Sequence, residues 1–136
     1  MKSVPVWVIL IILFIGSCRN DSSIGPSDLL LKRWHLYQTR RVQDNTWVMY
    51  DMDAYYDTEY RSNGMLVYRR NGIITEAGCC RGSQFERSGV SIRYNGFIAC
   101  PLVRCSSTTN ATITILKDNL LELQTGDLIS QYTPAN

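Results

Sequence analysis

Apolar and polar residues alternate along short segments of the chain from residue 34 onward. Residues 90–94 place Val, Ile and Tyr against Ser and Arg, and residues 111–115 place Ala and two Ile against two Thr. A two-residue period is that of a β-strand with one buried face. No apolar stripe at helical spacing is longer than two turns. The pattern therefore predicts an all-β domain.

Turn signals separate these segments at short intervals. Asn63-Gly64 and Asn71-Gly72 are the strongest, because a tight hairpin requires positive φ at both central residues. A further strand is predicted over residues 97–100. Eight or nine short strands joined by tight turns predict an antiparallel meander. Closure into a barrel would remove exposed edges, so we expect an up-and-down barrel of about eight strands, with a two-sheet sandwich as the alternative.

The first eighteen residues follow a different pattern. Lys2 precedes an apolar run over residues 4–15 that is shorter than the roughly 20 residues of a membrane-spanning helix. The run ends in Ile15-Gly16-Ser17-Cys18, which resembles the lipobox of bacterial lipoproteins. The resemblance implies cleavage before Cys18 and acylation of its thiol. Two or three acyl chains would anchor the protein stably.

This assignment divides the chain into three parts. Residues 1–17 are a signal peptide, residues 18–28 a lipidated, polar tether, and residues 29–136 the β domain. Arg19, rather than Asp, follows the cysteine. By resemblance to lipoprotein sorting rules, this favours a place in the cell envelope at the outer membrane, with the side that the domain faces left open.

Four cysteines remain after Cys18, and the compartment outside the inner membrane permits their oxidation. A bridge between the neighbours Cys79 and Cys80 would be strained. Two pairings stay open: 79–100 with 80–105, or 79–105 with 80–100. The spacing to Cys100 and Cys105 lacks the paired CxxC knuckles of a structural zinc site, so we expect structural disulfides.

Charge and motif content exclude several functions. Removal of Lys2 lowers Lys+Arg from 14 to 13 against 12 Asp+Glu, so the mature protein has a net charge near +1. That is too small for nucleic-acid binding. His35 is the only histidine, and no GxSxG elbow is present. We therefore expect no enzyme activity, no cofactor and no metal site.

The layout resembles the small bacterial lipocalin-like lipoproteins. The resembling features are Leu31-Lys32-Arg33-Trp34, the hairpin over residues 60–64, and residues 111–123 followed by Tyr132. The resemblance implies an up-and-down barrel around an apolar ligand, with Trp34 packing across the closed end; Lys32 stands where lipocalins have glycine. Residues 96–101 resemble the META envelope domains, which gives a second candidate architecture.

Tyrosines crowd residues 50–68, with arginines nearby. Tyr56, Tyr60 and Tyr68 could together form a polar-aromatic ligand pocket at the barrel mouth. The alternative is that tyrosine simply suits half-buried strands. Two functions follow as hypotheses: a module that binds a small hydrophobic or amphipathic ligand, or a structural or interaction lipoprotein that binds an envelope protein or a protease and no ligand.

Overall fold

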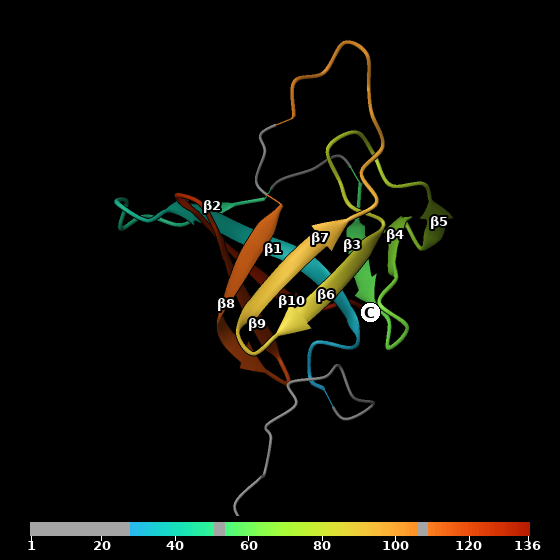
Figure 1. The fold of residues 1–136 in the computed structure, drawn as a ribbon. Coiled ribbons are helices and arrows are strands. Elements are labelled where there is room, and N and C mark those ends of the chain that lie inside the picture. Colours follow the sequence, from blue (N-terminus) through green and yellow to red (C-terminus); the bar gives the residue numbers. More distant parts are fainter. Residues whose placement is uncertain (1–27, 51–53, 106–108) are drawn as a thin grey trace, which may run out of the picture.

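The computed structural model describes residues 28–50, 54–105 and 109–136. The signal peptide, Cys18 and the tether up to residue 27 lie outside the described residues. Within these ranges the chain has strands and turns and no helix. The strands are β1 (Arg33–Arg41), β2 (Val48–Met49), β3 (Tyr56–Tyr60), β4 (Leu66–Arg70), β5 (Ile73–Thr75), β6 (Gln84–Ser88), β7 (Ser91–Asn95), β8 (Asn110–Lys117), β9 (Leu120–Thr125) and β10 (Leu128–Pro134) (Figure 1).

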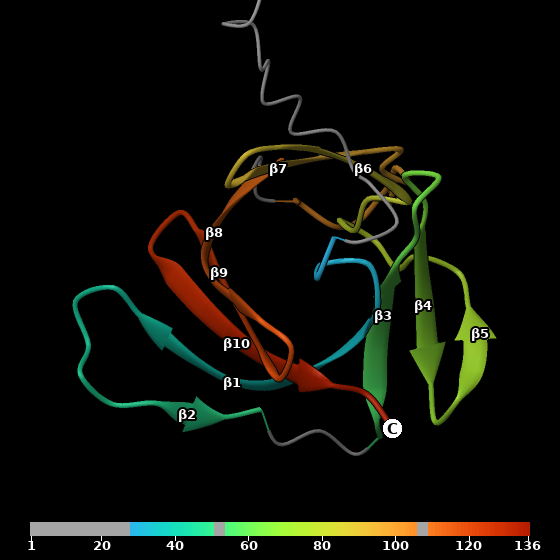
Figure 2. The same ribbon diagram turned by 90° about the horizontal axis from the view of Figure 1, so that it is seen from below.

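All ten strands belong to one antiparallel sheet in the order β5-β4-β3-β1-β10-β9-β8-β7-β6, with β2 paired to β1. The all-β prediction is therefore confirmed, and a two-sheet sandwich is not formed. Most strands that follow one another in the chain pair as in a meander, except β2 with β3 and β5 with β6, and β1 pairs with β10, which joins the first strand to the last. Figure 2 shows the strands running around a common interior.

The sheet is interrupted between β5 and β6, so strand pairing does not close it into a barrel. An isolated bridge between Met65, which precedes β4, and Gln84 of β6 spans the interruption at one point. Two backbone hydrogen bonds flank this bridge: Leu66 N donates to Ser83 O at 2.9 Å and Phe85 N donates to Gly64 O at 2.8 Å. Because β5 and β6 do not pair, the chain between them needs stabilising contacts other than strand hydrogen bonds.

The hydrophobic core fills one end of the interior. Most of it comes from alternate positions along the strands, whose side chains point inward, as the two-residue period predicts. Its buried members are Leu30, Trp34, Tyr60, Leu66, Phe85, Ile92, Ala111, Ile113, Leu121 and Leu123. Residues 28–32 enter this end before β1 and lie inside the ring of strands (Figure 2).

Trp34 is the largest side chain of this core and is 0% exposed. Its indole Nε1 donates a hydrogen bond to the Leu30 carbonyl at 3.0 Å. The Lys32 ammonium reaches the Asp118 carbonyl in the β8–β9 turn at 2.9 Å. These contacts place the entry of the described chain at the filled end of the molecule.

A buried carboxylate stabilises the outer face of β1, β3 and β4. Asp57 is 3% exposed and accepts hydrogen bonds from Arg33 Nε at 3.1 Å and Nη2 at 2.7 Å. Arg69 Nη1 lies 3.6 Å from Asp57, while its Nη2 donates to Glu59 at 2.6 Å. A bidentate arginine satisfies a carboxylate that is removed from water, so this pairing explains why a charge can be buried there.

Two strand assignments from the sequence need correction. Residues 97–100 form no strand, because Cys100 is tied by a disulfide to Cys79 and the following Pro101 cannot donate a ladder hydrogen bond. Conversely, β6 is a strand that the apolar pattern did not indicate. Phe85 is its only large apolar residue, and cross-strand pairing with β7 supplies the rest.

Candidate functional site

A cavity of about 500 Å³ occupies the end of the interior that the core leaves unfilled. Tyr60, Leu66 and Leu123 form its buried floor. Phe97 and Leu128, which also line it, are each about 40% exposed and mark its mouth. The volume lies within the roughly 300–1,000 Å³ of small-molecule sites. The interior is therefore filled at one end and hollow at the other.

Five tyrosines of the described chain line this cavity, four from strands spread around the sheet and Tyr50 from just after β2: Tyr50, Tyr60, Tyr68, Tyr94 and Tyr132. Tyr60 and Tyr94 share a hydrogen bond of 2.8 Å between their hydroxyls. The Tyr68 hydroxyl donates to the Gly82 carbonyl at 2.6 Å. Tyr60 also packs edge-to-face on Phe85 of the core, with ring centroids 4.9 Å apart. The wall thus combines aromatic faces with hydroxyl groups held in place.

The structure brings two of the three predicted pocket residues, Tyr60 and Tyr68, into the cavity. Tyr56 is not among the lining residues: it opens β3, and the Arg70 guanidinium lies 5.7 Å from its ring centroid. Tyr94 and Tyr132 were missed. Tyr94 lies two residues after Ile92, on the same face of its strand, which could have indicated its inward position. Tyr132 is brought to the cavity only by the pairing of β10 with β1.

Gly82 allows the β5–β6 connection to pass directly against β7. A Cβ at this position would lie 2.7 Å from the Asn95 carbonyl and 3.1 Å from the Tyr94 Cβ. A larger residue would push the connection away, and with it the carbonyl that accepts the Tyr68 hydroxyl. The glycine therefore fixes the position of one rim of the cavity.

Burial raises the pKa of four of these tyrosines: Tyr60, Tyr68, Tyr94 and Tyr132. Desolvation of the phenolate is the largest cause at each, and neighbouring tyrosines add to it. For Tyr68 the pKa is about 12, although the nearby Arg81 opposes the rise. The hydroxyls thus stay neutral at physiological pH.

These shifts predict how the protein responds to alkali. A raised folded-state pKa means that the unfolded chain loses these protons first, near pH 10. The contribution of these tyrosines to the free energy of unfolding should therefore be constant below about pH 10 and fall above it, by up to about 1.4 kcal/mol per pH unit for each buried tyrosine. Absorbance of tyrosinate, followed together with circular dichroism, measures both effects.

The control for this titration is the same chain in denaturant, where all eight tyrosines should ionise together near pH 10. In the folded protein the titration should split, with an early group and a late group that ionises as the fold opens. A single ionisation step near pH 10, with the fold intact, would contradict buried hydroxyls.

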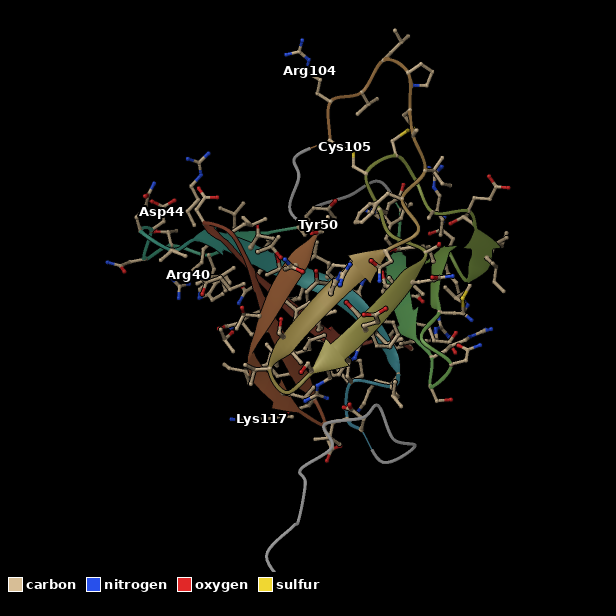
Figure 3. The ribbon with its side chains drawn as sticks, viewed as in Figure 1. Arg40, Asp44, Tyr50, Arg104, Cys105 and Lys117 are labelled. Carbon is tan, nitrogen blue, oxygen red and sulfur yellow. A yellow bond between two sulfur atoms is a disulfide. The ribbon has the colours of Figure 1, made fainter. Side chains whose placement is uncertain are left out.

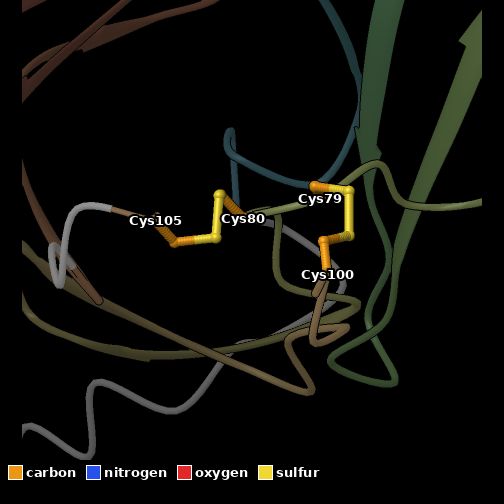
Figure 4. Close-up of a disulfide and its surroundings, with 4 residues drawn as sticks. All are labelled: Cys79, Cys80, Cys100 and Cys105. Atoms are coloured by element: carbon orange, nitrogen blue, oxygen red, sulfur yellow. A yellow bond between two sulfur atoms is a disulfide. The ribbon is translucent and has the colours of Figure 1, made fainter. Parts of the chain in front are cut away.

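Two disulfides hold the rim, Cys79–Cys100 with a Cα–Cα distance of 5.7 Å and Cys80–Cys105 with 5.1 Å (Figure 4). This is the first of the two pairings left open by the sequence. Both bridges join the β5–β6 connection to the β7–β8 connection. They lie in a turn, where Cys80 has a φ of +68°. The bridges therefore tie down the segment where strand pairing is interrupted.

Removal of one bridge should be costly. The double substitution Cys80→Ser with Cys105→Ser is expected to lower the free energy of unfolding by about 3 kcal/mol, because the loop that it opens restores chain entropy to the unfolded state. Urea unfolding of the purified protein measures this. Dithiothreitol should destabilise the wild type and leave a variant with all four domain cysteines replaced by serine unchanged; equal stability of wild type and double variant would contradict the prediction.

The β7–β8 connection also carries an exposed apolar loop, residues 97–103. Leu102 is 97% exposed and Val103 50% exposed. Figure 3 places Arg104 and Cys105, which follow the loop, at the same end of the molecule as Tyr50 and opposite Lys117. The loop therefore projects beyond the cavity mouth, on the side away from the entry of the described chain.

The histidine that the sequence singled out makes local contacts. His35 Nδ1 lies 2.8 Å from the Tyr56 carbonyl, and the imidazole stacks on Tyr55 at 4.0 Å. Among residues 28–50, 54–105 and 109–136, no group of three or more His, Cys, Asp or Glu could hold a metal ion. The same ranges contain no helix long and apolar enough to cross a membrane.

Comparison with known proteins does not extend this description. No protein-family model, curated protein or solved structure matches the chain.

Proposed function

We propose that this protein is a lipid-anchored binding module of the cell envelope, whose β domain holds a small amphipathic ligand in the tyrosine-lined cavity. The single observation that carries the proposal is the hollow end of the interior, about 500 Å³ with a buried aromatic and aliphatic floor. Apolar walls with a few fixed polar groups are typical of small-molecule sites. Acylated Cys18 supplies the anchor, and the outer membrane is the proposed location.

We further propose a lipocalin-like enclosure and membership among the lipocalin-like lipoproteins. The meander order, the pairing of β1 with β10 and the Met65–Gln84 bridge support this. The described chain begins at the filled end, so the cavity mouth opens on the side away from Asp28, the last residue of the proposed tether. That arrangement favours capture of the ligand from the aqueous compartment.

A cavity-filling substitution tests the proposal. Thr58 lines the cavity between Trp34 on β1 and Tyr68 on β4, so Thr58→Trp places a large ring inside it. Thr112→Trp on β8 adds the same ring at an exposed position and is the matched control. The neutral dye phenylnaphthylamine, which fluoresces in apolar sites, should bind saturably to the wild type and to Thr112→Trp, and weakly to Thr58→Trp.

Circular dichroism must show that both variants keep their β structure. Equal dye binding by the two tryptophan variants would place the dye outside the cavity and contradict the proposal, as would a wild type that binds no dye.

A second candidate function is recognition of an envelope protein through the apolar loop, residues 97–103. The observation that favours it is the almost complete exposure of Leu102, since contiguous exposed apolar residues often mark interaction sites. In-cell crosslinking should then give a reproducible protein adduct that Leu102→Ser removes. No adduct in the wild type would count against this candidate.

A further inference from the structure

Among the residues that the structure describes, one charged group lines the cavity. Arg81 lines it beside the Cys80–Cys105 bridge, and every other described lining residue is neutral. The hydroxyls of the wall remain protonated, since burial raises their pKa. No carboxylate of the described residues faces the cavity, so the field inside it favours a negative group.

Arg81 is held at the mouth and keeps its guanidinium available. Its Cζ lies 5.5 Å from the centroid of the Tyr68 ring, a cation–π arrangement that fixes the side chain over the cavity wall. Its influence on the pKa of both Tyr68 and Tyr132 reports its nearness to these two hydroxyls. Within the described chain Arg81 forms no ion pair, unlike Arg33, which is engaged by Asp57.

The depth of the cavity separates two chemical environments. The floor is made by Leu66 and Leu123 beneath the tyrosine rings, while the cation stands at the exposed mouth. A ligand that fits both has a compact ring or chain body and one polar end. A guanidinium presents paired N–H donors that match the two oxygens of a carboxylate or sulfonate.

We propose that the ligand is an organic anion, whose apolar body lies among the tyrosines and whose carboxylate-like group is bound by Arg81 at the mouth. This inference rests on the proposed function, because it assigns the ligand class of the same cavity. It also gives the Cys80–Cys105 bridge a role in binding, since the bridge fixes the backbone next to Arg81.

Two dyes with the same ring system test the charge requirement on the full, acylated protein. The detergent is kept below its critical micelle concentration, so that the dyes have no micelles to enter. Anilinonaphthalene sulfonate is anionic, and phenylnaphthylamine lacks the sulfonate. Arg81→Gln removes the guanidinium, and Arg81→Lys keeps the charge without the paired donors. Arg104→Gln, exposed beyond the cavity, removes the same net charge and is the control.

We expect Arg81→Gln to lower the affinity for the anionic dye about tenfold, as for loss of a charge-assisted hydrogen bond. Arg81→Lys should lose less. The affinity for the neutral dye should change by less than about twofold in all three variants. Arg104→Gln should change the affinity for either dye by no more than that, as expected for a remote surface charge.

The outcomes separate the two proposals. If Arg81→Gln leaves the anionic dye unchanged, or weakens both dyes equally, the organic-anion inference is overturned while the cavity remains a binding site. If Arg104→Gln weakens the anionic dye as much as Arg81→Gln, the attraction is only general surface charge, and the inference also fails. If the wild type binds neither dye, the proposed function itself fails and the inference with it.

Discussion

Replacement of Trp34 with alanine is expected to lower the free energy of unfolding by about 3–5 kcal/mol, the range for a large aromatic removed from a packed core. Trp34 is 0% exposed and lies at the filled end, so its removal leaves a cavity among packed side chains. The Leu30 carbonyl would also lose its indole donor. Domains of this size have total stabilities of about 5–15 kcal/mol, so the variant should be at the limit of folding.

Urea unfolding followed by circular dichroism measures this loss. Trp47→Ala is the matched control, because Trp47 is only half-buried and contacts Arg40 through a cation–π interaction with a separation of 4.8 Å. It should cost about 1 kcal/mol or less. Equal losses from the two substitutions would mean that Trp34 does not stabilise the filled end more than a half-buried tryptophan does.

Removal of the Asp57 carboxylate should have an effect of similar size. Asp57→Ala is expected to cost about 3–5 kcal/mol, because it leaves two guanidinium groups without their buried counter-charge. Arg33 makes a bidentate contact, and Arg69, whose side chain is 13% exposed, would have Glu59 as its remaining partner. The Arg33 side chain is 33% exposed and can be hydrated, so most of the cost falls on Arg69, which is largely removed from water.

The control is Asp118→Ala, which removes a carboxylate that is 86% exposed and 3.7 Å from Lys32. An exposed pair of this kind contributes about 1 kcal/mol or less. Urea unfolding of both variants at neutral pH gives the comparison. A loss at Asp57 no larger than that at Asp118 would contradict the account of the outer face.

The strand pattern could be predicted where both faces of a segment are distinct. The alternation over residues 90–94 and 111–115 predicted β7 and β8, because one face meets the core and the other meets water. It could not predict β6, which buries only Phe85. It also predicted a strand at residues 97–100, where disulfide bonding to Cys79 overrides local preference.

The site could be predicted only in part, because it depends on contacts between strands distant in sequence. The crowding of tyrosines drew attention to Tyr60 and Tyr68, which do face the cavity. Tyr132 reaches it only because β10 pairs with β1. Arg81, the single charge among the described residues of the wall, has no sequence signature; the adjacent Cys80 is the local feature that marks its position.

The central claim is that the hollow end of this domain holds a small molecule. Native mass spectrometry of the acylated protein, released gently from the membranes of the cells that make it, tests this most directly. We expect the intact mass to exceed that of the acylated chain by one small-molecule adduct, present in the Thr112→Trp control and absent from Thr58→Trp. An adduct-free wild type, or an adduct that persists at the same level in Thr58→Trp, would contradict the claim.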